Sequence, residues 1–378
     1  MNAKLLISGL LAFALCWVVG CAEKQRHEIK PEALGGIERE QQVDELMAAN
    51  KELEQGHLEK ARELFEAFKV KHEFSPFYQK AQLGQARALE QMGLWSEAAG
   101  LFKNMVESTR TTQPEIAGEA LYQSSYCYEA LGDEARVLAS LNDALRMGEA
   151  LRPEVRWAEI PARMAASYNR MGRLTEAKKS LAEAESGIQK IRSTMGEKLG
   201  NKELSRIYLQ MGSLSTNQLS FESFQSALET LKVVQTFALR SIEFNDPVYS
   251  TKALEGLKIN YRDLYLQVQQ VPFNSTLDVG AAKREQTERK TKMSAGLLMA
   301  IQLLRQSAMP ANTSVQASDS NPLSAQLVDY LKDLEDKLVG FLNSRGTINE
   351  LTPEALKIKS IKKNITIKSE PVFLNERK

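Results

Sequence analysis

Glycine, proline, histidine and cysteine are all scarce in this sequence of 378 residues. It holds 21 glycines and 11 prolines, while alanine, leucine, glutamate and lysine, the strong helix formers, are abundant. This composition favours a mainly helical, all-α protein. The three histidines and three cysteines leave little material for a metal site.

A surplus of one charge sign is also missing. The chain carries 49 Lys and Arg against 48 Asp and Glu, a net charge of +1. This balance excludes the strongly basic surface that general nucleic-acid binding requires. The hydrophobic fraction of 43% and the charged fraction of 26% are typical of a chain that folds, and they exclude global disorder.

The first twenty residues have the pattern of a targeting segment. Lys4 is followed by an uncharged apolar run over residues 5–19, which fits a secretory signal peptide and is shorter than the roughly 20 residues of a membrane-spanning helix. The run ends in Val18-Val19-Gly20-Cys21, which resembles the bacterial lipobox. The resemblance implies a lipoprotein signal peptide over residues 1–20, cleavage before Cys21 and lipidation of its thiol. A plain signal peptide, or a buried N-terminal helix that contains Cys21, is the alternative.

The residues around the lipobox also suggest a location. Ala22 follows Cys21 where lipoproteins retained at the inner membrane of diderm bacteria tend to carry Asp. The resemblance therefore implies a lipid anchor in the outer membrane, facing the periplasm; the outer leaflet of the inner membrane and the cell surface are the alternatives. After cleavage only Cys127 remains beside Cys21, so no internal disulfide is expected, and Cys127 is interpreted as a small buried hydrophobic residue.

Single glycines recur with a period near forty. The intervals between them are 37, 39, 40 and 40 residues, and the glycines are Gly56, Gly93, Gly132, Gly172 and Gly212. Seven residues before each glycine stands a small side chain: Ala49, Ala86, Ser125, Ala165 and Ser205. Five residues after it come Ala61, Ala98, Val137, Ala177 and Asn217. Small residues at fixed offsets let two antiparallel helices approach closely.

This pattern resembles the tetratricopeptide repeat, a helix–turn–helix unit. The clearest copies are residues 92–98 and 171–177. The resemblance implies a helical-hairpin solenoid of about five hairpins over residues 42–225, preceded by a lipidated cysteine and a flexible tether over residues 21–41. The first copy has Glu52, four residues before its glycine, where the family has an aromatic residue, and the fifth has Asn217 where the family has Ala. Terminal capping copies depart from the pattern in this way.

Helical signals continue beyond the repeats. Apolar spacing predicts helices over residues 226–244, 248–271, 278–309 and 323–342, and they divide into C-terminal helices at 226–309, a linker at 310–322 and a last helix at 323–345. Residues 346–378 form a basic tail. The tail is interpreted as solvated or loosely docked; the alternative is contact with an acidic partner or anionic lipid headgroups.

No catalytic motif stands out. His27, His57 and His72 lie in no metal-binding spacing, and the glycines occur singly rather than in a phosphate-binding loop. We therefore expect no enzyme activity, no catalytic residue, no metal and no cofactor.

Binding of another polypeptide is the better prospect. Stacked helical pairs present an extended concave surface, and the resemblance to the repeat family implies which side chains line it. For this chain the expected protein-binding groove consists of Arg87, Glu90, Tyr122, Tyr126, Asn169, Lys202 and Arg206. Aromatic rings beside Arg, Asn and Glu suit an extended peptide or a partner helix. Tyr122 and Tyr126 could equally belong to the core, because a buried tyrosine needs only its hydroxyl satisfied.

The sequence therefore predicts a lipid-anchored envelope scaffold that holds a protein or peptide partner. Its organisation is similar to that of outer-membrane-assembly lipoproteins and pilus or secretion pilot lipoproteins. Two alternatives stay open: an accessory regulator of cell-wall remodelling enzymes, and an enzyme whose site lies in the helices of residues 226–345.

Overall fold

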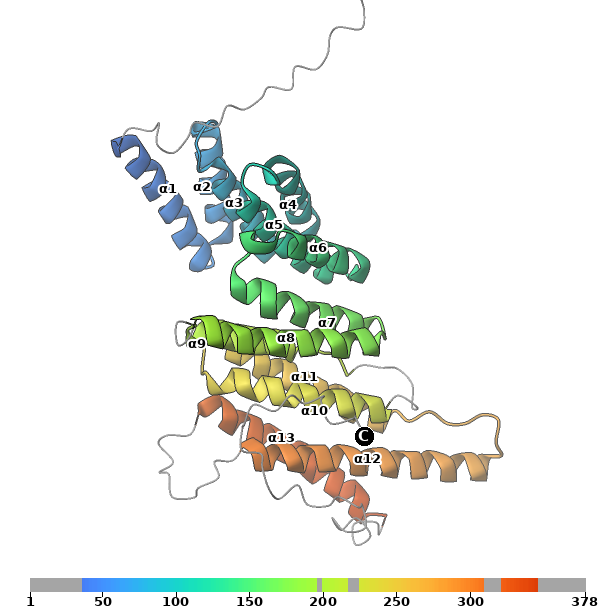
Figure 1. The fold of residues 1–378 in the computed structure, drawn as a ribbon. Coiled ribbons are helices and arrows are strands. Elements are labelled where there is room, and N and C mark those ends of the chain that lie inside the picture. Colours follow the sequence, from blue (N-terminus) through green and yellow to red (C-terminus); the bar gives the residue numbers. More distant parts are fainter. Residues whose placement is uncertain (1–35, 196–198, 217–223, 309–320, 346–378) are drawn as a thin grey trace, which may run out of the picture. The chain divides into compact units, whose positions relative to one another are not determined.

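The computed structural model describes residues 36–195, 199–216, 224–308 and 321–345, and within these ranges every regular element is helical (Figure 1). The α-helices are α1 (Gly36–Glu54), α2 (Leu58–Lys71), α3 (Tyr78–Gln91), α4 (Trp95–Thr109), α5 (Pro114–Ala130), α6 (Glu134–Arg146), α7 (Ile160–Arg170), α8 (Leu174–Met195), α9 (Asn201–Met211), α10 (Phe224–Glu243), α11 (Tyr249–Gln269), α12 (Val279–Ala308) and α13 (Pro322–Asn343). A short 3₁₀-helix, η2 (Gly148–Ala150), and a π-helix, η3 (Val155–Glu159), lie between α6 and α7. The all-α fold class is confirmed.

The chain forms two compact units, residues 1–101 and residues 102–378, and the division falls within α4. Each unit is built from helices that pack against their neighbours in sequence. In the first unit α1 packs on α2 and α2 on α3. In the second, α5 packs on α6, α7 on α8, α9 on α10 and α10 on α11.

Four of the five predicted turn glycines end a helix in the same way. Gly56, Gly93, Gly132 and Gly172 have φ values of 79°, 79°, 71° and 74°. At the first of them, the amide of Gly56 donates to the carbonyl of Leu53 at 3.1 Å. Glycine occupies this left-handed region without a Cβ penalty and closes the helix end. Each of these four glycines thus closes the end of a helix at a tight turn.

The small residues at the predicted offsets fill the space between paired helices. Those described at the two offsets are all buried: Ala49, Ala61, Ala86, Ala98, Ser125, Val137, Ala165, Ala177 and Ser205. The helices of the first unit also approach closely, since a Cβ added at Gly84 would collide with the Phe65 ring. Cys127, interpreted as a buried small residue, is fully buried on α5.

The fifth repeat departs from the pattern. Gly212 has φ −83°, in the ordinary helical region, so the chain does not reverse there. It continues without regular structure through residues 213–216, and the next described helix, α10, begins only at Phe224. The predicted copy position Asn217 lies outside the described residues. The third repeat interval, between Gly132 and Gly172, contains η2 and η3.

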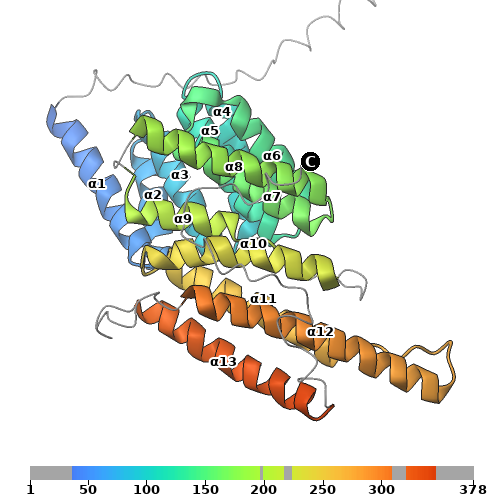
Figure 2. The same ribbon diagram turned by 60° about the horizontal axis from the view of Figure 1, so that its bottom comes forward.

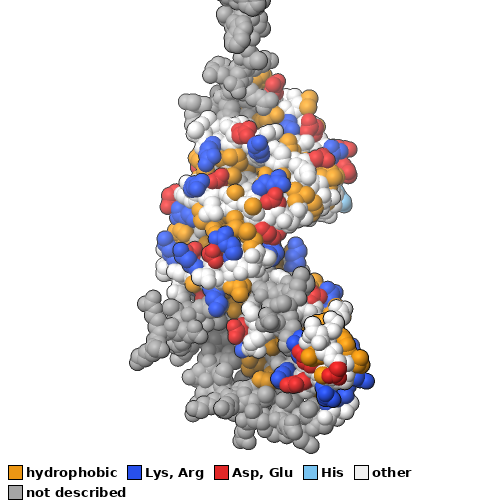
Figure 3. All heavy atoms as spheres, turned by 90° about the vertical axis from the view of Figure 1, so that its right-hand side faces the viewer, with side chains coloured by type: hydrophobic (Ala, Val, Ile, Leu, Met, Phe, Trp, Pro, Cys, Tyr) orange, Lys and Arg blue, Asp and Glu red, His pale blue; other side chains and the backbone are white. Residues whose placement is uncertain are grey.

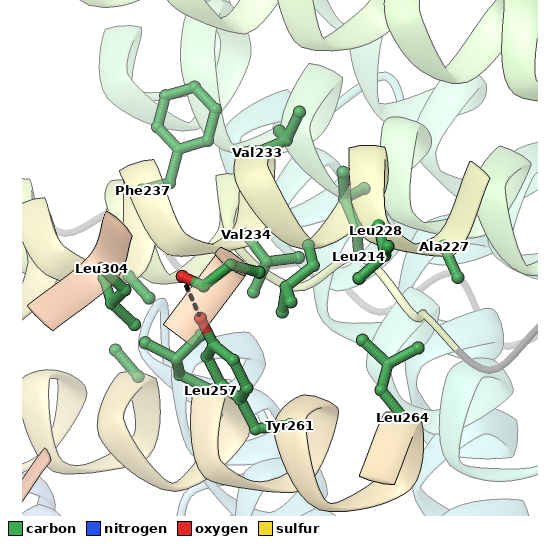
Figure 4. Packing of buried hydrophobic residues seen from close by; sticks show 14 of the residues in the cluster. Leu214, Ala227, Leu228, Val233, Val234, Phe237, Leu257, Tyr261, Leu264 and Leu304 are labelled. Carbon is green, nitrogen blue, oxygen red and sulfur yellow. Dashed lines mark hydrogen bonds between the residues drawn. The ribbon is translucent and has the colours of Figure 1, made fainter. Parts of the chain in front are cut away.

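The four helices predicted beyond the repeats are present as α10–α13, with bounds within two residues of those predicted. Their apolar faces form the largest core of the second unit (Figure 4). Phe237 and Val234 of α10, Leu257 and Tyr261 of α11 and Leu304 of α12 are each almost completely buried there. Burial raises the pKa of Tyr261, whose hydroxyl is hydrogen-bonded to Gln235.

The N-terminal boundary differs from the prediction. α1 begins at Gly36, so residues 36–41, assigned to the flexible tether, are helical. The reason is local: residues 37–54 contain neither glycine nor proline and are rich in Glu, Gln, Leu and Ala. The signal peptide, Cys21, most of the 310–322 linker and the basic tail lie outside the described residues. Among the helices that are described, none has the length and apolar character needed to cross a bilayer.

Candidate protein-binding face

The expected groove residues fall in both units. Arg87 and Glu90 are half-buried on α3 of the first unit. The other five lie on the first helices of successive pairs in the second unit, with Tyr122 and Tyr126 on α5, Asn169 on α7, and Lys202 and Arg206 on α9.

Three of these residues meet around one buried carboxylate. Glu159, the last residue of η3, is 1% exposed. Its Oε2 accepts a hydrogen bond from the Tyr122 hydroxyl at 2.6 Å, and its Oε1 accepts one from Nε of Arg206 at 2.8 Å. The Tyr122 hydroxyl also lies 2.7 Å from that of Tyr126. A buried carboxylate held by a cation and a phenol is satisfied, which is the condition for keeping it inside.

The pKa shifts in this cluster keep Tyr122 and Arg206 protonated, so that both can donate hydrogen bonds to Glu159. Burial raises the pKa of Tyr122 well above its ordinary value, and the charge of Glu159 raises it further, so the phenol remains a donor. Burial would lower the pKa of Arg206, but Glu159 together with the neighbouring tyrosines outweighs that effect, and the net shift is upward. The Arg206 guanidinium therefore stays charged beside Glu159.

A second buried charge, Arg163 of α7, continues the network. Its side chain is 2% exposed. Nη2 donates to Oε2 of Glu129 at 2.7 Å, Nη1 is hydrogen-bonded to Ser125 Oγ, and the guanidinium carbon lies 3.4 Å from the centre of the Tyr126 ring. Burial would lower the pKa of Arg163, but the adjacent hydroxyl oxygens of Tyr126 and Tyr122 and the carboxylate of Glu129 together outweigh that effect and raise it.

The network ends at the turn between α5 and α6. Arg170 Nη1 lies 2.9 Å from Glu129 Oε1, and its Nη2 donates to Glu134 Oε2 at 3.0 Å. Ser167 Oγ donates to the same Glu134 oxygen at 2.6 Å. Alternating charges thus join α5, α6, η3, α7 and α9 in one connected polar network.

The structure therefore gives the expected groove residues different roles. Tyr122 is buried, so the alternative that it belongs to the interior holds for this residue. Tyr126 and Arg206 are half-buried members of the same network, and Lys202 is exposed on α9. A charge reversal at Arg206 would set a second carboxylate beside Glu159 and would disturb the network as well as any bound partner.

Sequence reasoning missed Glu159 and Arg163, the two most buried charges of the network. Both lie near the irregular segment between repeats, where the glycine-based offsets do not apply. Pro161 has no amide proton to donate to the carbonyl of Trp157, four residues earlier, and the amide of Ile160 bonds five residues back to Val155. A proline close after a charged, aromatic segment is the only local signal of this π-helix.

Asn169 has yet another role. Buried on α7, its Oδ1 accepts a hydrogen bond from the backbone amide of Ser215 at 2.9 Å. Asn260 of α11 does the same for the amide of Thr216 at 3.1 Å and for its hydroxyl at 2.8 Å. The side-chain amides of Asn169 on α7 and Asn260 on α11 therefore hold residues 215 and 216.

An open cavity of about 330 Å³ lies beside this segment, between the end of α9 and α11. Its apolar lining is Leu209, Leu214, Ala238, Ala253, Leu257 and Ile259, and its polar lining is Ser213, Ser215, Lys252, Asn260 and Asp263. Ile259 remains 45% exposed at this cavity. A Cβ placed on Gly256, which also lines it, would meet nothing within 4 Å. The volume suits one large apolar side chain.

The chemistry of this cavity is that of binding. Its lining contains one carboxylate, Asp263, which is paired with Arg262 at 3.3 Å, and no histidine or cysteine. Across the described ranges, no three His, Cys, Asp or Glu residues are grouped in a way that could hold a metal ion.

Comparisons with known proteins add little to this geometry. No protein-family model matches the chain, and no curated protein sequence does. Among solved structures, the complex of the TPR2AB domain of yeast Sti1 with pHSP90 is similar over 84% of this chain and 99% of that one, at 14% identity and a TM-score of 0.29. A circular tandem repeat protein with a novel repeat topology is similar over 81% of this chain and 78% of that one, at 12% identity and a TM-score of 0.23. Such TM-scores are too low to carry an argument about function.

Proposed function

We propose that this chain is a protein-binding scaffold, and that the cavity between α9 and α11 receives an apolar side chain of a partner polypeptide. The observation that carries the proposal is the cavity itself, which is open, lined by aliphatic side chains on one side and edged by hydrogen-bonding groups on the other. Sites of this make-up hold an apolar anchor and fix its orientation through polar contacts.

A polypeptide suits the cavity better than a small polar ligand. Asn169 and Asn260 already accept hydrogen bonds from backbone amides of residues 213–216. The Lys252 ammonium, which lines the same cavity, offers donors to carbonyl groups. An extended partner segment would supply both kinds of backbone group with an apolar side chain between them.

The polar network supports this function by holding the helices in place. Glu159 ties α5 to α9, and Arg163 ties α7 to α5. A binding face whose helices are cross-linked in this way loses little conformational entropy when a partner docks.

The location of the scaffold belongs to the same proposal. The lipobox-like residues 18–21 support an anchor at Cys21 on the periplasmic face of the outer membrane, where several acyl chains would hold the protein almost irreversibly. Replacing Cys21 with Ala should release the chain from the membrane fraction. If the variant stays in that fraction, the lipid anchor is wrong, whereas partner binding at the cavity would be unaffected.

Site-specific crosslinking tests the binding function. A photoactivatable amino acid at Ile259 in the otherwise native chain should form an adduct with a polypeptide in the cell. Gly256→Leu should remove that adduct, because the new side chain occupies the cavity without colliding with its lining. Gly340→Leu is the matched control, since Gly340 is also a helical glycine with open space around its Cα. An adduct that persists in Gly256→Leu, or that disappears equally in Gly340→Leu, contradicts the proposed cavity contact.

A further inference from the structure

The connection between α11 and α12 presents apolar side chains to solvent. Phe273 is 47%, Leu277 41% and Val279 75% exposed. The first turns of α12 project beyond the ends of α10 and α13 in both ribbon views (Figures 1 and 2). Three apolar side chains within seven residues at this projecting end form an exposed patch on the described part of the second unit.

The backbone that carries this patch is nevertheless fixed. Gln286 of α12 donates to the carbonyl of Val271 at 2.7 Å, and Asn274 donates to Glu285 at 2.9 Å. Asp278 accepts hydrogen bonds from the amides of Gly280 and Ala281 at the start of α12. The apolar side chains are therefore held outward by a well-bonded connection.

A basic cavity lies next to the patch. It has a volume of about 230 Å³ and is lined by Gln269, Val271, Lys283, Gln286, Thr287, Lys290, Phe341 and Arg345. Three of these side chains are cationic and none is acidic. The Lys290 ammonium lies 5.0 Å, and the Arg345 guanidinium carbon 5.7 Å, from the centre of the Phe341 ring. The Phe341 ring thus helps to set two cations toward one small volume.

The acidic residues of the same helix segment are occupied elsewhere. Glu285 pairs with Arg289, and Glu288 pairs with Lys292 at 2.7 Å. Lys283 enters no ion pair within the described part of the chain. In Figure 3, which looks onto this end of the molecule, hydrophobic and basic side chains lie beside one another at the lower right, with acidic ones among them. Among the described residues, the lining of this cavity therefore carries three positive charges and no negative one.

We propose that this end of the second unit binds the surface of a membrane that contains anionic phospholipids. Phe273, Leu277 and Val279 enter the boundary between headgroups and acyl chains, and the cavity formed by Lys283, Lys290 and Arg345 holds a headgroup phosphate. Apolar side chains next to basic ones are the combination that binds a protein peripherally to such a surface. The contact is independent of acylation at Cys21 and of the cavity between α9 and α11.

A phospholipid fits this surface better than an acidic protein segment. The apolar patch lies on a projecting connection, which can enter a soft interface but offers a protein partner no groove. The cavity is large enough for a phosphate and has donors from lysine, arginine and glutamine. Binding to an acidic polypeptide is one of the outcomes of the test.

Tryptophan fluorescence tests the proposal in the full-length chain. Phe273→Trp places a reporter in the patch, and the signal is read as the difference from the parent protein with its three tryptophans. With vesicles of brominated phosphatidylcholine and phosphatidylglycerol, the fluorescence of the reporter should be quenched and its emission maximum should shift to the blue. With brominated phosphatidylcholine alone, the effect should be much weaker. Val70→Trp is the control, since Val70 is 76% exposed, as Val279 is, but lies on α2 of the other unit.

Removing the three positive charges of the cavity tests whether the cavity contributes to membrane binding. Each cation near an anionic surface changes membrane partitioning about fivefold, so Lys283→Gln with Lys290→Gln and Arg345→Gln should weaken binding of the reporter chain about a hundredfold. The matched charge control is Lys103→Gln with Lys179→Gln and Arg146→Gln, all at exposed side chains. The proposal would be overturned if the reporters at positions 273 and 70 were quenched equally, or if quenching were equal without phosphatidylglycerol. Equal weakening of binding by both triple variants would also overturn it. So would a reporter that responds to polyglutamate and ignores the vesicles.

Discussion

The guanidinium carbon of Arg163 lies 3.4 Å from the centre of the Tyr126 ring. This contact joins α7 to α5 at a place where both helices also share an ion pair, because Nη2 of Arg163 donates to Glu129 at 2.7 Å. The arginine is buried, so its charge depends on these partners in place of water. A buried cation with an aromatic face on one side and a carboxylate on the other is strongly favoured only while both remain.

Loss of this cation should therefore destabilise the second unit. Arg163→Met keeps much of the apolar volume but leaves Glu129, Ser125 and Tyr126 without their partner. We expect the free energy of unfolding to fall by about 3–5 kcal/mol, measured as a lower urea midpoint in circular dichroism. Arg146→Met is the control, because Arg146 is 73% exposed and pairs only with Asp143 at the surface, a pair that contributes below ~1 kcal/mol. Similar midpoints for the two variants would contradict the role given to Arg163.

The acid stability of the unit should depend on Glu129. Burial raises the pKa of Glu129, but the charges of Arg163 and Arg170 outweigh that effect and hold it below its ordinary value. The unfolded chain then takes up a proton at a higher pH than the folded one. Stability from this group is present above the unfolded pKa of about 4.5 and is lost as the pH falls through the folded value.

Urea midpoints measured between about pH 6 and pH 3 check this linkage. In Glu129→Gln the midpoint should be lower at pH 6, but it should fall less steeply with acid than in the parent chain. Parallel curves for the two proteins would mean that the Glu129 ion pairs contribute nothing to acid stability.

Much of the fold was predictable because it depends on local rules. The left-handed glycine at a hairpin turn is required by backbone sterics alone, and Gly56 and Gly172 illustrate it with φ values of 79° and 74°. The helices beyond the repeats follow from apolar periodicity, and α13 begins where Asn321 caps its first turn and Pro322 starts the helix. These signals need no knowledge of the tertiary structure.

The site was less predictable because its contacts connect distant parts of the chain. Glu159 meets Arg206 across 47 residues, and Asn169 meets Ser215 across 46. The repeat offsets selected Tyr122 and Arg206, but they could not show that the carboxylate between them comes from a π-helix outside the pattern. The offsets also failed at Gly212, where a glycine without positive φ leaves the chain free to run along the inner helices.

The close contact between α8 and η3 should make one glycine indispensable. A Cβ at Gly187 would collide with the carbonyl group of Trp157, which is rigid backbone. Gly187→Ala should therefore lower the free energy of unfolding by about 3 kcal/mol, measured by urea unfolding, and should move η3 with its Glu159. Gly340→Ala should do the reverse and raise stability by about 0.5–1 kcal/mol, because that helical glycine has open space around it. If Gly187→Ala were as stable as Gly340→Ala, the close approach of α8 would be wrong.

Asn169 and Asn260 should protect separate amides of the segment at residues 213–216. Asn169→Ala removes the acceptor of the Ser215 amide, and Asn260→Ala removes that of the Thr216 amide. A lost hydrogen bond of about 1 kcal/mol corresponds to roughly fivefold faster exchange, so hydrogen exchange should quicken mainly at position 215 in the first variant and at 216 in the second. Asn142→Ala is the control, since Asn142 bonds only within its own helix at Leu138. Because Ser215 and Asn260 line the proposed binding cavity, the same variants should weaken crosslinking from Ile259. Unchanged exchange at both amides would show that the two asparagines do not hold the segment, and the argument that they select polypeptide backbone would fall with it.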